Sequence, residues 1–154
     1  MALVFATVFL FPLCNLATGL PELGTPLLYG ALAAVAEEFF FRGFVFTALK
    51  KKGRFWAAAV SSVAFAALHL LNLVSAPLDY TLLQVIGAFS VGFALCGLLW
   101  KTKKLWLCLV CHLLINLTGH TTLSSVGTCL TILCIFLYAG FGILLLRKNN
   151  EVLL

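Results

Sequence analysis

The sequence predicts an all-α, polytopic membrane protein with about six transmembrane helices. Three observations lead to this fold class: 63% of the 154 residues are hydrophobic, only 10% are charged, and the basic residues gather in short clusters between long apolar runs. Soluble domains are typically about 45–50% apolar and about 25% charged, so the composition indicates an integral membrane protein. The net charge of +5 does not indicate nucleic-acid binding, because the basic residues do not form one solvated face.

Six apolar segments are expected to cross the membrane, which takes roughly 20 helical residues. The first is short and contains Pro12, and the fifth is short unless it extends into the basic loop before it. Small residues, among them Ser61, Ser62, Ala88 and Gly92, let neighbouring helices approach closely. We find no repeat or linker, so residues 1–154 are predicted to form a single membrane domain. The segments cover residues 2–17, 26–49, 55–74, 80–100, 105–117 and 126–146.

The basic clusters predict the orientation in the membrane. Nine of the ten Lys and Arg residues lie at 50–54, 101–104 and 147–148. If each segment crosses once, these clusters share one side, and the loops with Glu22, Asp79 and His120 share the other. Because cytoplasmic loops carry the excess of Lys and Arg, we expect both termini in the cytoplasm.

The segment 26–49 carries three charged residues inside its apolar run: Glu37, Glu38 and Arg42. An unpaired charge in hydrocarbon costs several kcal/mol, so such groups are expected to be paired and to mark a functional site. Glu38 and Arg42 are four residues apart and can form an ion pair on one helix face. Glu37, about 100° further round the helix, is then free to face another neighbour.

Two more apolar segments carry polar side chains. His69 follows Phe65 by four residues on segment 55–74, and Asn116 follows His112 by four on segment 105–117. A single histidine or asparagine in a membrane helix is more often an interhelical hydrogen-bonding residue. Three segments that together carry a glutamate, two histidines and an asparagine indicate instead a hydrolytic site in the bundle interior.

The expected depths of these residues agree only in part. Glu37 and His69 lie 13 and 15 residues from the nearest basic cluster, or roughly 20 Å along a helix. His112 lies only 8 residues from Lys104, or roughly 12 Å. The fifth segment is therefore expected to tilt, to sit deeper, or to begin inside the basic loop.

Three motifs in these segments resemble the CPBP intramembrane protease family, which includes the CAAX prenyl endopeptidases and bacteriocin-processing or immunity relatives. The family's Glu-Glu-x-x-x-Arg motif appears at residues 37–42, its Phe-x-x-x-His motif at 65–69 and its His-x-x-x-Asn motif at 112–116. Each motif is short, but all three are intact, in order and on separate apolar segments. The resemblance covers roughly residues 26–116.

The resemblance implies a four-helix catalytic core, within residues 26–120, that hydrolyses a peptide bond in or at the edge of the membrane. Residues 1–25 would then form a first helix and an outer loop, and residues 126–146 a last helix. Family members generally have more helices before the glutamate motif. We therefore expect either a short member of the family or a chain that lacks its true start.

Two accounts of the implied catalytic site stay open. In one, Glu37 and His69 position and deprotonate a water molecule, while His112 and Asn116 donate hydrogen bonds to the oxyanion. In the other, which fits the family's frequent description as metalloproteases, Glu37, His69 and His112 hold a zinc ion that activates its bound water. The sequence has no His-Glu-x-x-His signature, which favours the metal-free account.

Four further residues have supporting roles in both accounts. Glu38 and Arg42 are expected to orient Glu37, and Phe65 to form a wall of the pocket. Asn72, one turn beyond His69, either lines the pocket or caps its helix.

The expected partners are the lipid bilayer and a peptide or lipidated-protein substrate. A CAAX-type prenylated peptide is the family's best-known substrate, and a secreted peptide precursor or another membrane protein is the alternative. Two rival functions remain: a non-catalytic membrane binding or immunity protein of the same family, and a transporter. Intact polar positions disfavour the first, and the lack of a repeat or of a pair of broken helices disfavours the second.

The six cysteines lie in apolar segments and are expected to pack as small hydrophobic residues. Cys108, Cys111 and His112 match the Cys-x-x-Cys-His pattern of covalent haem attachment. That chemistry needs an exposed peptide on the outer side of the membrane, whereas this stretch lies inside an apolar helix. We therefore expect no haem.

Overall fold

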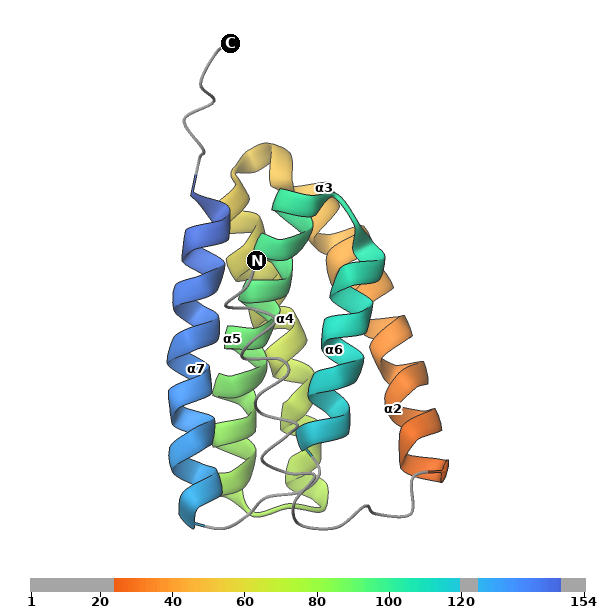
Figure 1. Ribbon diagram of the computed structural model, residues 1–154, viewed down its shortest axis with the longest axis vertical. Coiled ribbons are helices and arrows are strands. Elements are labelled where there is room, and N and C mark those ends of the chain that lie inside the picture. The colour runs from red at the N-terminus through yellow and green to blue at the C-terminus, as the bar shows by residue number, and fades with distance from the viewer. Residues whose placement is uncertain (1–23, 120–124, 148–154) are drawn as a thin grey trace.

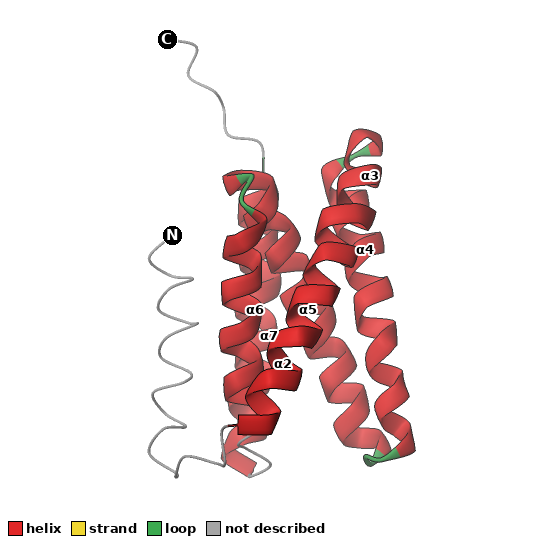
Figure 2. Ribbon diagram, turned by 90° about the vertical axis from the view of Figure 1, so that its right-hand side faces the viewer, coloured by secondary structure: helices red, strands yellow, loops and turns green. Residues whose placement is uncertain are grey.

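In the computed structural model, which describes residues 24–119 and 125–147, every regular element is a helix (Figure 1). The helices run alternately up and down (Figures 1 and 2). The predicted all-α class is confirmed. The expected first segment, 2–17, and the loop residues Glu22 and His120 lie outside the described residues.

The predicted segment 26–49 is one continuous helical run built from four elements. It comprises α2 (Gly24–Glu37), the π-helix η1 (Glu38–Phe46), α3 (Thr47–Leu49) and the 3₁₀ turn η2 (Lys50–Lys52). Gly53 then reverses the chain with φ 135°, a conformation that glycine adopts without a Cβ penalty. The sequence pattern gave no sign of the π-helix.

The remaining predicted segments match helices to within a few residues. The segment 55–74 comprises α4 (Arg54–Leu68) and the 3₁₀ helix η3 (His69–Val74). The other three are α5 (Leu78–Thr102), α6 (Leu105–Gly119) and α7 (Ser125–Leu146). The basic residues at 50–54 and 101–104, together with Arg147, lie at the same end of the bundle (Figure 1).

Two helical stretches are long and apolar enough to cross a membrane: α4 with η3, of 21 residues, and α5, of 25 residues. The apolar stretches Leu105–Asn116 and Thr131–Leu146 are shorter. Large hydrophobic side chains such as Phe40, Phe44 and Trp56 point outward and are exposed, as lipid-facing residues are. The total of six crossings stays a prediction.

Helix α5 is the centre of the bundle and packs against α4, α6 and α7, and α6 also packs against α2. Glycines allow α5 and α7 to meet backbone to backbone. A Cβ added at Gly142 would lie 2.6 Å from Phe93 Cδ1, and one added at Gly97 would lie 3.1 Å from the Gly142 carbonyl oxygen. Close contact of this kind compensates for the weak hydrophobic driving force between helices in lipid.

Candidate active site

The first motif lies where α2 changes into the π-helix η1. A π-helix has i→i+5 hydrogen bonds, is rare, and often occurs at functional sites. Two hydroxyl groups bond to backbone carbonyls of this widened helix. Ser61 Oγ on α4 donates to Phe41 O at 2.7 Å, and Thr47 Oγ1 donates to Arg42 O at 2.9 Å. The Ser61 bond therefore ties α4 to the π-helix that carries Glu38.

Glu38 and Arg42 form the predicted ion pair. Arg42 Nη1 lies 2.8 Å from Glu38 Oε1, and both side chains are 0% exposed. The guanidinium carbon of Arg42 also lies 4.3 Å from the centre of the Phe65 ring, a cation–π contact. Two buried charges thus neutralise each other beside an aromatic face, as burial requires.

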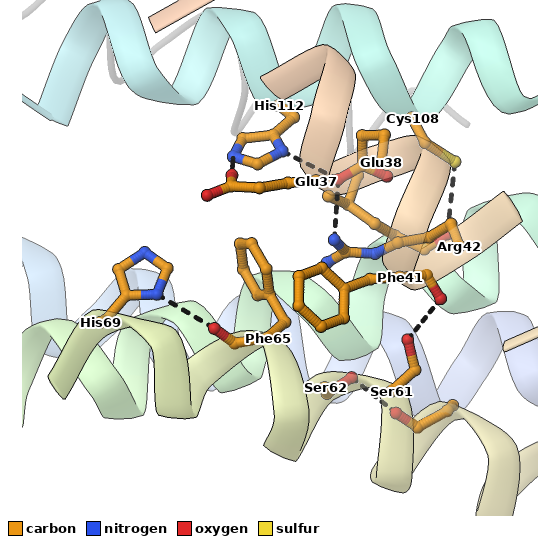
Figure 3. A network of polar contacts seen from close by, with 12 residues as sticks. Glu37, Glu38, Phe41, Arg42, Ser61, Ser62, Phe65, His69, Cys108 and His112 are labelled. Atoms are coloured by element: carbon orange, nitrogen blue, oxygen red, sulfur yellow. Dashed lines mark hydrogen bonds and ion pairs between the residues drawn. The ribbon is translucent and has the colours of Figure 1, made fainter. Parts of the chain in front are cut away.

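The imidazole of His112 on α6 lies between the two carboxylates (Figure 3). Its Nδ1 is 2.8 Å from Glu38 Oε1, and its Nε2 is 3.5 Å from Glu37 Oε2. Glu38 therefore contacts both Arg42 and His112 through the same oxygen, Oε1. The sequence predicted only the contact with Arg42. His112 is 4% exposed and Glu37 is 26% exposed, whereas Glu38 is fully buried, so Glu37 is the more accessible of the two carboxylates.

The expected mismatch in depth does not keep His112 from the glutamates. Helix α6 begins at Leu105, not inside the basic loop, and His112 still reaches both carboxylates. Helix α2 packs against α6 and leans away from the other helices at its N-terminal end (Figure 1). Of the three ways to reconcile the depths, an early start of the helix is wrong, and a tilt or a deeper position of the helix stays a prediction.

Each histidine uses Nδ1 to meet an oxygen atom. A carbonyl oxygen only accepts hydrogen bonds, so His69 Nδ1, 3.2 Å from Phe65 O, donates to it. His112 Nδ1 meets Glu38 Oε1. In both rings Nε2 takes no part in these bonds, and in His112 it is the nitrogen that faces Glu37.

Phe65 connects the second motif to the rest of the site. Its ring is 2% exposed and packs edge-on against His69 and His112, with ring centres 5.1 and 5.5 Å away. His69 thus reaches the cluster through an aromatic contact with Phe65. Asn116 donates from Nδ2 to Gly30 O on α2 at 3.3 Å, and Asn72 bonds to Gln84 on α5.

The site therefore has a tight cluster and two flanking residues. Glu37, Glu38, Arg42 and His112 are joined by contacts of 2.8 to 3.5 Å. His69 and Asn116, predicted for the same site, lie on the adjoining helical segments η3 and α6 and bond to backbone carbonyls.

The donor set does not fit the zinc account. Across residues 24–119 and 125–147, no three His, Cys, Asp or Glu side chains are arranged to hold a metal ion. Of the three ligands in that account, Glu37 and His112 Nε2 face each other, whereas His69 meets the cluster through the Phe65 ring, which packs against both histidines. A tetrahedral zinc site needs its ligands to converge on one point.

Gly92 on α5 is a part of the site that the sequence suggested only as a packing residue. A Cβ there would lie 3.1 Å from Arg42 Nη2 and 3.2 Å from both Phe65 Cδ1 and Ser62 Cβ. The absence of a side chain thus makes room for the Arg42–Phe65 stack. In the sequence it is a glycine inside an apolar segment, which indicates close helix packing but not a place in the site.

The cysteines differ in their surroundings. Cys96 and Cys108 are buried as expected, and Cys108 Sγ donates to Leu95 O at 3.4 Å. Cys111 and Cys134 are half-buried, whereas Cys129 is exposed, which the expectation of packing did not foresee. Cys14 lies outside the described residues.

Comparisons with known proteins agree with the motifs. The family model described as type II CAAX prenyl endopeptidase Rce1-like matches residues 19–118. That range contains all three motifs and the whole cluster around His112. Searches of curated proteins and of solved structures find no significant match.

Proposed function

Because this chain belongs to the type II CAAX prenyl endopeptidase Rce1-like family, we propose that it is an intramembrane endopeptidase. Its substrate would be a membrane-associated or lipidated peptide, with a prenylated CAAX peptide as the first candidate. The observation that carries the proposal is the contact of the accessible Glu37 with a buried, oriented His112. A carboxylate and an imidazole side by side can divide proton transfer and charge stabilisation between them.

In the proposed reaction Glu37 is the general base. It takes a proton from a water molecule, whose oxygen attacks the carbonyl carbon of the scissile bond. The C–N bond of the tetrahedral intermediate then breaks, and Glu37 returns the proton to the departing amine. General acid–base catalysis of this kind contributes about 10²–10⁴-fold in rate. His69, with Nε2 free to accept a hydrogen bond, helps to hold the water.

The oxyanion would be stabilised by His112 and Asn116. His112 would donate from Nε2, the nitrogen that faces Glu37. Asn116 has two N–H donors, and its single bond to Gly30 leaves the second for the intermediate. Donors placed in advance at a water-poor site are the largest single source of catalysis in many enzymes.

Glu38, Arg42 and Phe65 position these groups without touching the substrate. Glu38 fixes the His112 ring through Nδ1, and Arg42 holds Glu38 in place through the same carboxylate oxygen. Phe65 separates the buried ion pair from the side of the site where His69 lies. None of these steps uses a metal ion, in keeping with the poor fit of the donor set to zinc.

We propose a multi-pass arrangement with both termini in the cytoplasm. It is supported by the placement of the described basic clusters at one end of the bundle, where the positive-inside rule puts the cytoplasmic face. The site then lies within the membrane, between α2, α4 and α6. Substrates that are anchored in the bilayer by a lipid would reach it from the side of the membrane.

Purified full-length protein in detergent, incubated with a fluorogenic farnesylated CAAX peptide, tests this proposal. We expect cleavage by the parent and loss of cleavage in the Glu37→Ala and His112→Ala variants. Asp79→Asn is the matched control, because Asp79 is an exposed acid at the start of α5. Absence of cleavage in the parent on lipidated and plain peptides, or its survival in both variants, would overturn the proposal.

A chelator separates the two mechanisms. The metal-free account predicts that dialysis against a tight zinc chelator leaves the rate unchanged. A loss of rate that added Zn²⁺ restores would instead support the zinc account, in which the ligands move together on binding the metal.

A further inference from the structure

The turn that carries His69 differs from the helix before it. Helix α4 ends at Leu68, and residues His69–Val74 form the 3₁₀ helix η3. In a 3₁₀ helix, side chains three residues apart lie on the same edge. Asn72 therefore lies one turn from His69 on the same side of η3, so what holds Asn72 also sets the rotation of the segment that presents His69.

Asn72 is held by a residue that no motif contains. Its Nδ2 donates to Gln84 Oε1 on α5 at 2.7 Å, and both side chains are half-buried. The Asn72 carbonyl also accepts from the backbone N–H of Ser75 at 3.0 Å and of Ala76 at 2.8 Å, which closes the turn into α5. Both ends of this amide pair are thereby fixed.

The ring of His69 is fixed from the other side. Its Nδ1 bonds to Phe65 O one turn earlier, and its ring packs against the Phe65 ring. These contacts set the tilt of the ring but not the position of η3 relative to α5. The amide pair supplies that second constraint, at the point where α4 stops being an α-helix.

We propose that Gln84 is a positioning residue of the active site, acting through Asn72 to hold η3 so that His69 Nε2 faces the reacting water. This inference rests on the proposed proteolytic function. The 3₁₀ turn at His69 has poorer hydrogen-bond geometry than an α-helix, so the external bond from Asn72 to Gln84 adds a constraint that the turn does not supply itself.

Removal of the amide pair tests the inference. Gln84→Met and Asn72→Leu keep the size of each side chain but remove the hydrogen bond. We expect each to lower kcat about tenfold or more through misplacement of His69, with little change in KM. The kcat of the double variant should be no lower than that of either single variant. A variant that exchanges the two amides, Asn72→Gln with Gln84→Asn, should recover most of the parent kcat, because the two side chains together have the same length as before.

Two comparisons separate positioning from a structural role. Ser90→Ala removes a side-chain hydrogen bond on α5 that stays within its own helix, Ser90 Oγ to Ile86 O at 3.1 Å, and should leave kcat unchanged. In a His69→Ala background, Gln84→Met should have no further effect on the residual rate. A tenfold loss of kcat caused by Gln84→Met in the His69→Ala background would overturn the inference. A loss of kcat in proportion to a fall in melting temperature would do the same.

A measurement without substrate keeps the inference testable if the activity assay fails. In protein labelled with ¹⁵N-histidine, the ring signals of His69 should shift in Gln84→Met while those of His112 stay in place. Unchanged His69 signals contradict the role of Gln84 whether or not the parent cleaves a peptide. An inactive parent with shifted His69 signals contradicts the proteolytic function and leaves the positioning of His69 by Gln84 supported.

Discussion

Glu38 and His112, from helical segments far apart in the sequence, are joined by a 2.8 Å contact between Oε1 and Nδ1. The same glutamate oxygen lies 2.8 Å from Arg42 Nη1. Glu38 is thus fully buried and bound to Arg42 and His112, whereas the adjacent Glu37 is partly exposed.

Glu37 and Glu38 should differ in their effect on stability. Glu38→Gln leaves the buried Arg42 charge without its partner and should cost about 3 kcal/mol, as broken buried ion pairs do. Glu37→Gln should change the stability little, because this side chain is partly exposed and contacts only His112 among its charged neighbours in the described residues. Thermal unfolding in detergent measures both. Equal losses in the two variants would contradict separate roles.

Gly92→Ala should impair activity more than folding. The added methyl would lie 3.1 Å from Arg42 Nη2 and 3.2 Å from Phe65 Cδ1, so the stack that walls the site must shift. We expect at least a tenfold fall in kcat, given the sensitivity of catalysis to misplacement of about 1 Å. Gly140→Ala is the control, since an added Cβ there meets no atom within 4 Å. Similar rates for both variants would show that the space at Gly92 is not needed.

Gly142→Ala should destabilise the bundle itself. Its Cβ would lie 2.6 Å from Phe93 Cδ1 and 3.1 Å from the Ala94 backbone nitrogen, so α7 must move away from α5. Overpacking of this kind costs about 1–3 kcal/mol. The melting temperature should fall relative to Gly140→Ala on the same helix. An unchanged melting temperature would mean that α5 and α7 do not meet as closely as described.

Ser61→Ala should weaken the π-helix. The substitution removes the hydrogen bond to the buried Phe41 carbonyl, and a lost buried partner costs about 1–3 kcal/mol. Ser62→Ala is the neighbouring control, because Ser62 Oγ bonds to Ala58 O within its own helix. Hydrogen exchange of the amides in η1 should rise in the first variant and not in the second. The reverse order would contradict the role given to Ser61.

Much of this architecture could be predicted from the sequence, because each long apolar segment of a membrane protein usually forms one helix. Segments 80–100, 105–117 and 126–146 each match a helix to within a few residues at either end. The Glu38–Arg42 pair followed from a spacing of four residues and the cost of burying a charge. Such local rules hold as long as the backbone is close to a regular helix.

The rest depended on contacts between helices, which spacing does not encode. Both glutamates contact His112 on α6, whereas the spacing predicted only that Glu38 pairs with Arg42 and that Glu37 faces another neighbour. The 3₁₀ turn at His69 likewise places Asn72 against Gln84. Residues without a charge or a motif, such as Gly92 and Gln84, carried too weak a signal to be placed in the site.

The most direct test of the central claim is the cleavage rate of the Glu37→Gln variant, measured in single turnover on the farnesylated CAAX peptide and beside its thermal stability. This substitution keeps the shape of the side chain and removes only its capacity to accept a proton. We predict a loss of at least about 10²-fold in the rate with the parent's melting temperature. A folded Glu37→Gln variant that cleaves the peptide within about tenfold of the parent rate would contradict the account.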